Sequence, residues 1–290
     1  MPSYLVTGGS GQLGQCFHAV AKESPEINLF FTSRNEVDIT RSETLVNFYS
    51  KNPFDGIINC AAFTYVDQAE KEEESAFKIN TEGLQNLIDF AENKNISIIH
   101  FSTDYVFDGG SSEPYPEESV TNPIGIYGNS KLKGEVRLSK SSCKSVTIRI
   151  SWLFSPFGKN FVKMIARIAK EKSALEVVGD QLGRPTYGID LARTVIKLIL
   201  NDTMHTFPTL HYANQGVCNW KVFADAIVNE LECKTIIQGI STSAYPTLAK
   251  RPNCSVLNTE RIEKELGVTI PTWQESLKKC IQILKNDGSL

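Results

Sequence analysis

Short apolar runs recur through the first half of the chain, and stretches compatible with helices separate them. Strands that alternate with helices indicate βαβ units and a parallel sheet. The runs are almost continuously apolar, as expected of strands that are covered on both faces. The predicted strands are 4–8, 29–33, 56–62, 97–103 and 145–151, and the predicted helices are 12–24, 42–51, 74–93 and 128–140.

After about residue 155 the pattern changes, and predicted helices outnumber strands. We expect a short strand at 210–214 and helices at 159–171, 189–200, 219–231, 258–265 and 272–284. The sequence therefore predicts an α/β fold, with a Rossmann-type doubly wound parallel sheet in residues 1–155. Residues 156–290 would form a smaller, mainly helical substrate-binding region, from which segments near 187–215 return to the first domain.

Composition and charge exclude several classes of partner. The net charge of −3 provides no broad basic surface for nucleic acid. No apolar run approaches the roughly 20 residues that span a bilayer, and the N-terminal segment resembles a strand more than a signal peptide. We therefore expect a cytoplasmic protein without nucleic-acid or membrane partners, and a homodimer stays open. The seven scattered cysteines show no ligand spacing, so free thiols and no metal site are expected.

A glycine-rich segment, YLVTGGSGQLGQ, joins the first predicted strand to the first predicted helix. Gly8 would make the tight turn, Gly11 would let a pyrophosphate approach the backbone, and Gly14 would let the helix pack closely on the strand. Gln12 and Leu13 lie at the N-terminus of that helix, which offers free N–H groups to phosphates. The position of the motif between strand and helix favours a dinucleotide site over a plain turn.

The end of the second predicted strand indicates whether the site prefers NAD(H) or NADP(H). It carries Arg34 where NAD-selective sites have a carboxylate, and an arginine suits a 2′-phosphate. We expect NADP(H) to be preferred, with NAD(H) open and a solvated surface arginine as the alternative. The remaining predicted cofactor contacts are Asp38 and Ile39, which would flank the adenine, and Ala61, Ala62 and Thr64 after the third strand.

The segment IYGNSKLKGE places Tyr127 and Lys131 four residues apart, on one face of a predicted helix. A tyrosine with a pKa near 10 needs a stabilised phenolate to act in acid–base catalysis at neutral pH. A fixed ammonium one turn away provides such stabilisation. The spacing by itself also fits ordinary helix packing.

Several ordered motifs resemble the extended short-chain dehydrogenase/reductase family: TGGSGQLG at 7–14, NCAAFTYVDQAE at 59–70, STDYVFDG at 102–109 and YGNSK at 127–131. Two further segments are similar to the subgroup that reduces dTDP-4-dehydrorhamnose: RISWLFSPFGKNFV at 149–162 and DQLGRPTYGIDLA at 180–192. The resemblance extends from about residue 3 to 192, with a weaker tail.

The resemblance implies a catalytic trio of Thr103, Tyr127 and Lys131. Tyr127 would donate a proton to the ketone oxygen of the substrate, and Thr103 would hydrogen-bond and orient that oxygen. Lys131 would lower the pKa of the tyrosine and contact the nicotinamide ribose, while the nicotinamide supplies the hydride. Both Tyr127 and Lys131 thus belong to the predicted cofactor contacts as well.

Tyr105 favours simple reduction over 4,6-dehydration, because related dehydratases carry a glutamate at this position to manage the C5 proton. Epimerisation stays open on this argument. Val66, Tyr105 and Trp152 are candidate walls around the sugar. The predicted substrate-binding set is Val66, Thr103, Asp104, Tyr105, Trp152, Asn160 and Arg184, of which Asn160 and Arg184 are candidates for the diphosphate.

The predicted activity is an NAD(P)H-dependent oxidoreduction in the biosynthesis of polysaccharide precursors. It would reduce the C4 ketone of a nucleotide-linked 4-dehydro-6-deoxyhexose, foremost dTDP-4-dehydro-β-L-rhamnose to dTDP-L-rhamnose. A UDP-linked sugar, an epimerase and a reductase for another deoxyhexose stay open. The alternative of another class is a non-catalytic NADP-binding regulatory subunit, because the β subunit of methionine adenosyltransferase resembles the same subgroup and retains the Tyr-xxx-Lys pattern.

Overall fold

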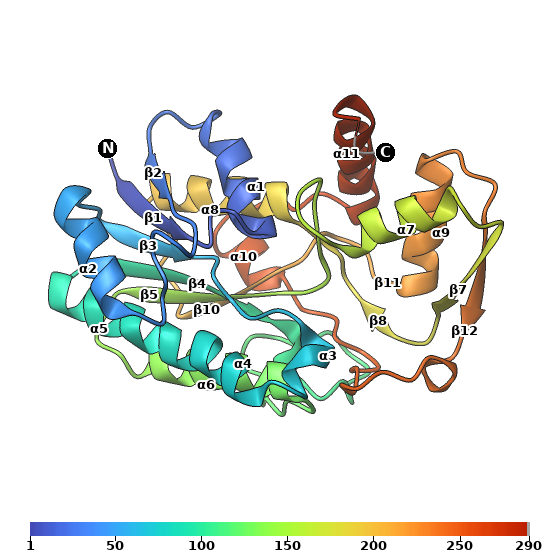
Figure 1. Cartoon of the computed structure of the whole chain (residues 1–290), viewed down its shortest axis with the longest axis horizontal. Helices are drawn as coiled ribbons and strands as arrows, with labels where there is room; N and C mark the ends of the chain where they lie inside the picture. The colour runs from blue at the N-terminus through green and yellow to red at the C-terminus, as the bar shows by residue number, and fades with distance from the viewer. Residues whose placement is uncertain (289–290) are drawn as a thin grey trace.

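The computed structural model describes residues 1–288 and contains a six-stranded, all-parallel sheet (Figure 1). The strand order is β10-β5-β4-β3-β1-β2, and every neighbouring pair in it is parallel. The Rossmann-like α/β prediction is therefore confirmed. The strands are β1 (Ser3–Thr7), β2 (Asn28–Phe31), β3 (Gly56–Asn59), β4 (Ser97–Thr103), β5 (Ser145–Ile150) and β10 (Thr209–Tyr212).

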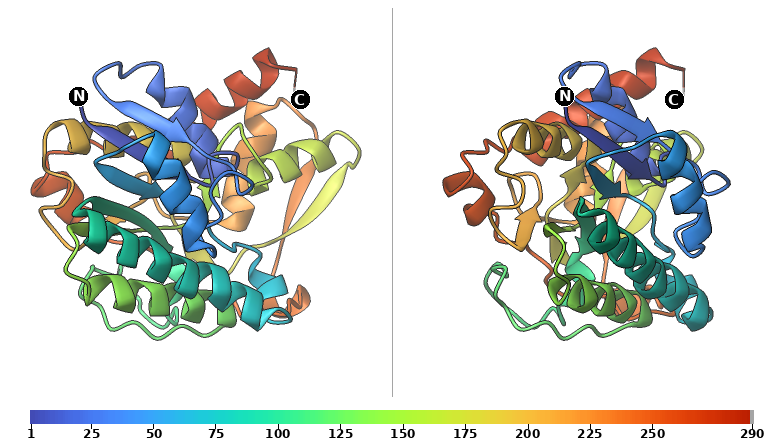
Figure 2. Two further views of the ribbon diagram at one scale, coloured as in Figure 1. Left: turned by 60° about the vertical axis from the view of Figure 1, so that its left-hand side comes forward. Right: turned by 90° about the vertical axis from the view of Figure 1, so that its left-hand side faces the viewer.

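Helices cover both faces of this sheet, as Figures 1 and 2 show. Neighbouring residues of one strand enter different cores: Val6 packs in the larger cluster and Leu5 in the smaller. Both side chains are fully buried, which explains the continuously apolar runs. One face carries α1 (Gln12–Ala21) and α8 (Gly188–Leu200), and the other carries α2 (Ser42–Lys51), α5 (Leu84–Lys94) and α6 (Ile126–Ser139).

The second part of the chain forms a smaller region beside the carboxyl edge of the sheet. Its helices are α7 (Phe161–Ala169), α9 (Trp220–Glu230) and α11 (Trp273–Asn286), whereas α10 (Glu260–Lys264) contacts β10 of the main sheet. The helices α7 and α9 accompany a two-stranded parallel sheet of β7 (Ala174–Val178) and β12 (Ile236–Ile240), visible in Figure 1. Two more strand pairs are β6 (Leu153–Phe154) with β9 (Thr186–Tyr187), and β8 (Leu182–Gly183) with β11 (Cys218–Asn219).

The sequence pattern missed parts of this region. The strands β7 and β12 lie outside every predicted strand, because their exposed positions break the apolar run. The predicted helix at 74–93 exists, but it consists of α4 (Glu73–Phe77), a π-helical turn η1 (Lys78–Gly83) and α5. The strand β10 pairs with β5, so this later segment joins the main sheet. The domain boundary near residue 155 stays a prediction.

The parallel strands end at one edge of the sheet, and the short elements that follow them carry the candidate chemistry. The turn η2 (Asp104–Val106) follows β4, and α3 (Val66–Ala69) follows β3 after a loop. Ligands of such sheets bind at the carboxyl ends of the strands. Among residues 1–288, no helix is long and apolar enough to cross a membrane.

Candidate functional site

The glycine-rich turn after β1 has the geometry of a phosphate cradle. Gly8 adopts a φ of +61°, and a Cβ on it would lie 2.9 Å from the Cα of Ala61. A Cβ on Gly14 would lie 2.5 Å from the carbonyl oxygen of Gly8, so only glycine allows α1 to pack so closely. Gly11 precedes α1, which begins at Gln12. The free N–H groups of this helix N-terminus fit a dinucleotide phosphate.

Arg34 is available for a ligand. Its side chain is 73% exposed, and its Nε pairs with the Asp38 carboxylate at 3.3 Å. Asp38 itself accepts hydrogen bonds from Thr40, and these bonds hold its pKa below the ordinary value although burial opposes them. The exposed guanidinium beside the end of β2 therefore fits a 2′-phosphate, whereas Asp38 shapes its own loop.

The other predicted cofactor contacts surround the glycine turn. The Gln12 amide donates to the carbonyl oxygen of Leu153 at 3.2 Å, which links α1 to β6. Leu13 and Ile39 are buried in the two cores. Ala61 and Ala62 are half-buried and Thr64 is exposed, all in the loop after β3. This loop lies against Gly8, as expected of small residues near a dinucleotide.

The three predicted catalytic residues meet at the carboxyl end of β4. Thr103 is the last residue of β4, while Tyr127 and Lys131 lie in the first two turns of α6. The Thr103 hydroxyl accepts the N–H of Tyr105 at 3.1 Å and donates to Asp104 Oδ1 at 3.1 Å, and it is close enough to the Tyr127 phenol to affect its pKa. The structure thus brings together residues that are 24 to 28 positions apart in the chain.

The electrostatics of this group differ from the sequence expectation. Burial raises the pKa of Tyr127 to about 12, a hydrogen bond with Thr103 opposes this rise, and the charge of Asp104 adds to it. Burial lowers the pKa of Lys131 to about 8. The Lys131 ammonium donates to the carbonyl oxygen of Phe101 at 2.6 Å. In this structure the lysine therefore does not lower the tyrosine pKa, because burial dominates and the amine is bonded elsewhere.

Asp104 is a buried carboxyl beside the trio. It is 2% exposed, and its Oδ2 has no hydrogen-bond partner among the described residues. Burial raises its pKa to about 6, although hydrogen bonds from Ser255 and Thr103 oppose the rise. Asp104 stays a predicted substrate contact, and its carboxyl would have to reach the substrate from a buried position.

Two further residues, which the sequence pattern did not single out, fix the position of α6. A Cβ on Gly128 would lie 2.1 Å from the carbonyl oxygen of Tyr105, so this glycine lets α6 contact the turn η2. The Glu70 carboxylate accepts the N–H of Ile126 at 2.8 Å and thereby satisfies the start of α6. The glycine between Tyr127 and Lys131 was the available signal, whereas the acidic run around Glu70 resembles any solvated helix face.

A cavity of about 690 Å³ is lined by Tyr105 but by none of the three predicted catalytic residues. Its wall includes Val66 and Tyr105, two of the predicted substrate contacts, together with residues of α7, β7 and the loop after η3 (Thr242–Ala244). The Tyr105 ring also contacts the Tyr127 ring edge-on, with centroids 5.8 Å apart. Tyr105 thus connects the cavity with the candidate catalytic tyrosine, and the volume is that of a small-molecule site.

Trp152 lies near this region but outside the lining of the cavity. It adopts a φ of +47°, uncommon for a bulky residue, and its ring stacks on Trp220 at 3.6 Å. Trp220 itself lines the cavity. Strained backbone of this kind often marks a functional position, and Trp152 stays a predicted sugar contact.

The structure argues against diphosphate binding by Asn160 and Arg184. The Asn160 side chain caps α7 by accepting the N–H of Lys163, and its amide donates to two carbonyl oxygens of the preceding turn. Arg184 is 6% exposed and donates to Asn214 O, Leu257 O, Thr259 Oγ1 and Gln215 Oε1. Both side chains are used to connect segments of the fold. The sequence pattern does not reveal these partners, because they meet the two side chains only in the folded chain.

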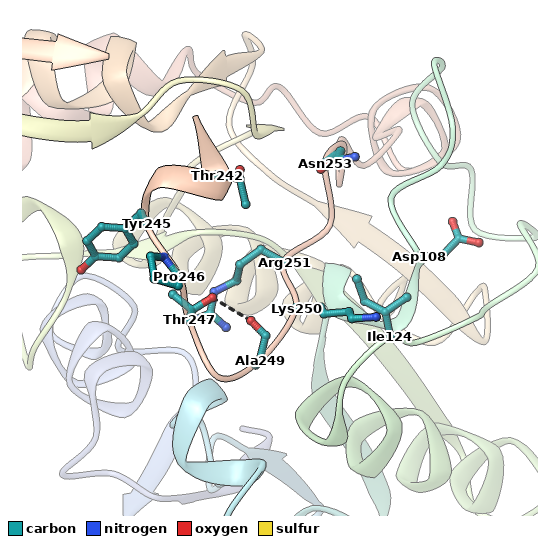
Figure 3. Close-up of a pocket in the computed structure, with 10 residues that line it drawn as sticks. All are labelled: Asp108, Ile124, Thr242, Tyr245, Pro246, Thr247, Ala249, Lys250, Arg251 and Asn253. Atoms are coloured by element: carbon teal, nitrogen blue, oxygen red, sulfur yellow. Dashed lines mark hydrogen bonds between the residues drawn. The ribbon is translucent and has the colours of Figure 1, made fainter. Parts of the chain in front are cut away.

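Arg251 offers a free donor at the cavity instead. Its Nη2 pairs with the Asp67 carboxylate at 2.7 Å, and its guanidinium lies over the Tyr105 ring at 5.9 Å. Its Nη1 is buried without a hydrogen-bond partner among the described residues. Arg251 lines both the large cavity and an adjoining pocket of about 340 Å³ (Figure 3), which also contains Lys250. The segment YPTLAKRP carried this residue, but no spacing rule singles it out.

Comparison with known proteins decides the family. The sequence pattern of the family described as RmlD substrate-binding domain matches residues 3–286. This chain belongs to that family.

Curated relatives in the family are similar over nearly the whole chain. A dTDP-4-dehydrorhamnose reductase of Aggregatibacter actinomycetemcomitans is 38% identical, over 96% of this chain and 98% of its own. The spore coat polysaccharide biosynthesis protein SpsK of Bacillus subtilis is 36% identical, over 97% of this chain and 98% of its own. The chain is therefore a homologue of the reductases, and a polysaccharide biosynthesis protein is also related.

The fold of this chain is also similar to that of a solved dTDP-4-dehydrorhamnose reductase. The dTDP-4-dehydrorhamnose reductase of Bacillus anthracis in complex with NADP superposes with a TM-score of 0.92 at 33% identity, covering 97% of this chain and 99% of that one. The RmlD-family chain thus has the fold of an NADP-binding reductase. Among its residues 1–288, no three His, Cys, Asp or Glu side chains are grouped to hold a metal ion.

Proposed function

We propose that this RmlD-family protein is an NADP(H)-dependent reductase of the C4 ketone of a nucleotide-linked 4-dehydro-6-deoxyhexose. The preferred substrate is dTDP-4-dehydro-β-L-rhamnose, and the product is dTDP-L-rhamnose. The observation that carries the proposal is the convergence of Thr103, Tyr127 and Lys131 at the end of β4, where the Tyr127 ring contacts Tyr105 in the wall of a cavity of about 690 Å³. The similarity to two dTDP-4-dehydrorhamnose reductases supports the substrate.

The cradle of Gly8, Gly11 and Gly14 fits the pyrophosphate of the dinucleotide, and the exposed Arg34 fits its 2′-phosphate. When bound, the reduced nicotinamide supplies the hydride that adds to the ketone carbon. This chain's own residues must then supply the proton and hold the oxygen.

Tyr127 donates its phenolic proton to the ketone oxygen, which becomes the C4 hydroxyl. Its high pKa keeps it protonated over the whole neutral range, so the phenol carries the proton that it donates. Thr103 orients the same oxygen through its hydroxyl. Lys131 would hold the nicotinamide ribose through its amine, which donates the stronger hydrogen bond when it carries a proton.

The nucleotide would occupy the cavity between α3, α7 and the loop after η3. Arg251 is the donor we assign to the diphosphate, because this residue lines the cavity and its Nη1 has no hydrogen-bond partner among the described residues. A charged hydrogen bond from a guanidinium is the strong kind of phosphate contact. The stacked Trp220 and Trp152 would border the sugar end.

The deciding assay mixes the protein with NADPH and the 4-dehydro sugar nucleotide and follows the absorbance of reduced nicotinamide. The upstream 3,5-epimerase generates the β-L-configured substrate where needed. Loss of absorbance with formation of one 6-deoxyhexose nucleotide per NADPH is expected. A folded protein that binds NADPH without consuming it contradicts the proposal and favours a regulatory subunit. The same assay with a UDP-linked sugar tests the nucleotide.

A further inference from the structure

A single carboxylate connects one loop of the cavity wall to a distant part of the chain. Residues 246–252, called the wall loop here, contribute side chains to both the large cavity and the adjoining pocket. Asp67 on α3 accepts the N–H of Ala249 through Oδ1 at 3.0 Å, and its Oδ2 accepts Arg251 Nη2 at 2.7 Å. One side chain therefore holds the loop at two points.

Among the described residues, no other hydrogen bond joins the wall loop to a different segment. The Thr247 hydroxyl donates to the Ala249 carbonyl oxygen at 2.8 Å, but this bond lies within the loop (Figure 3). The guanidinium of Arg251 lies over the Tyr105 ring at 5.9 Å, which is near the limit of a cation–π contact. The position of the loop thus depends strongly on Asp67.

The helix that carries Asp67 is itself well anchored. Ala69, in the same short helix, is fully buried in a cluster with Phe63. Glu70 directly follows α3 and accepts the N–H of Ile126 at the start of α6, at 2.8 Å. Asp67 is therefore a fixed point to which the wall loop is attached.

The contact of Asp67 with Arg251 leaves part of the guanidinium free. A guanidinium carries five N–H donors in a planar fork. Nη2 is paired with Asp67, whereas Nη1 has no hydrogen-bond partner among the described residues. An arginine held in this way needs less ordering when a ligand binds, so less of the binding free energy is lost.

We propose that Asp67 is a positioning residue for a nucleoside diphosphate: it fixes the wall loop and holds Arg251 by one edge, so that the remaining N–H groups are placed for the diphosphate. The proposal rests on the proposed function, because it deepens the role given there to Arg251. The sequence pattern does not reveal Asp67, because its two partners lie 182 and 184 positions further along the chain.

The charge of Asp67 gives the test a definite sign. A carboxylate that lines the cavity repels a diphosphate, and this repulsion would be relieved by removing Asp67. If the charge were its main effect, loss of Asp67 would tighten nucleotide binding. If Asp67 positions Arg251, its loss weakens nucleotide binding instead.

The experiment compares Asp67→Ala, which removes both acceptor oxygens, with Asp67→Asn, which keeps one of them. Calorimetry measures the Kd for dTDP and for UDP, and initial rates give kcat and KM for the sugar nucleotide. We expect Asp67→Ala to raise the Kd and KM by about tenfold and Asp67→Asn to raise them less. The kcat and the affinity for NADPH should change little. Glu23→Gln, at an exposed carboxylate paired with Arg193 at 2.9 Å, is the matched control and should resemble the wild type.

A double variant shows whether Asp67 acts through Arg251. Two residues that act as one unit give losses that do not add as free energies, whereas independent residues give losses that multiply. Asp67→Ala combined with Arg251→Gln should therefore bind dTDP about as weakly as Arg251→Gln alone. Independent action would give the product of the two single losses.

Tighter dTDP binding by either Asp67 variant would overturn the inference, and so would multiplied losses in the double variant. Failure of Asp67→Asn to fold, or a wild type that binds neither dTDP nor UDP, would overturn it as well. If the wild type binds dTDP and NADPH but turns over no sugar nucleotide, the proposed function fails. The Kd values for dTDP still decide the role of Asp67 in that case.

Discussion

Gly128 lies against the backbone of Tyr105 so closely that a Cβ on it would be 2.1 Å from the Tyr105 carbonyl oxygen. The contact joins the second residue of the Tyr-Gly-x-x-Lys segment to the turn that follows Thr103. The placement of Tyr127 relative to Thr103 therefore depends on Gly128, which has no side chain.

Gly128→Ala should displace α6 from this turn, because backbone atoms leave no room for the methyl group. We expect a fall in kcat of at least about tenfold, with destabilisation of about 1–3 kcal/mol from overpacking. Turnover and thermal unfolding measure the two effects. Gly239→Ala is the matched control, since its nearest atom would be Lys221 Cγ at 3.6 Å. Unchanged kcat in Gly128→Ala would show that the contact does not position Tyr127.

Tyr127→Phe should retain NADPH binding and lose turnover by roughly 10²–10⁴-fold, because the proton donor is removed while the ring remains. The rate of NADPH oxidation measures turnover, and a fluorescence titration with NADPH measures binding. Tyr49→Phe on α2, far from the site, is the control. A variant with wild-type turnover would exclude Tyr127 as the acid.

Activity should be limited at alkaline pH by Lys131 and not by Tyr127. Burial lowers the pKa of Lys131 to about 8, so the charged amine is present below that pH and is lost as the pH rises through it. Tyr127 keeps its proton until about pH 12. The kcat/KM profile, which reports the free enzyme, should fall with one proton lost near pH 8. A flat profile up to pH 10 would contradict this assignment.

Arg34→Ala should weaken NADPH binding by about tenfold or more and leave NADH binding nearly unchanged. The reason is that only NADPH carries a 2′-phosphate, and a hydrogen bond to a charged group contributes about 1.5–3 kcal/mol. Arg41→Ala, at another exposed arginine that pairs with Glu43, is the control. Equal losses for both dinucleotides would remove Arg34 from the selectivity argument.

Arg251→Gln should raise KM for the sugar nucleotide by about tenfold or more with little change in the affinity for NADPH, because the lost guanidinium belongs to the wall of the cavity. Initial rates over a range of substrate concentrations give KM. Arg193→Gln, at a half-exposed arginine paired with Glu23, controls for the loss of a charge. A Kd for NADPH that rises as much as KM would place Arg251 at the dinucleotide instead.

Local sequence was sufficient for the features that depend on neighbouring residues. The strands of the six-stranded sheet, the glycine turn and the Tyr127–Lys131 spacing follow from apolar runs, backbone sterics and helix periodicity, which act over a few positions. The resemblance of ordered motifs added Thr103 and the reaction class, and the family assignment agrees with it. These are properties of short segments.

Tertiary structure alone decided which side chains are free to act. The Asn160 amide bonds the turn before α7 and Arg184 bonds distant segments, while Arg251 in the cavity wall has a nitrogen without a partner among the described residues. Burial, not the neighbouring amine, sets the pKa of Tyr127, and His100 meets Lys131 only because β4 and α6 pack together. Hydrogen-bond satisfaction and desolvation depend on the whole three-dimensional surroundings of a group, so no pattern along the chain contains them.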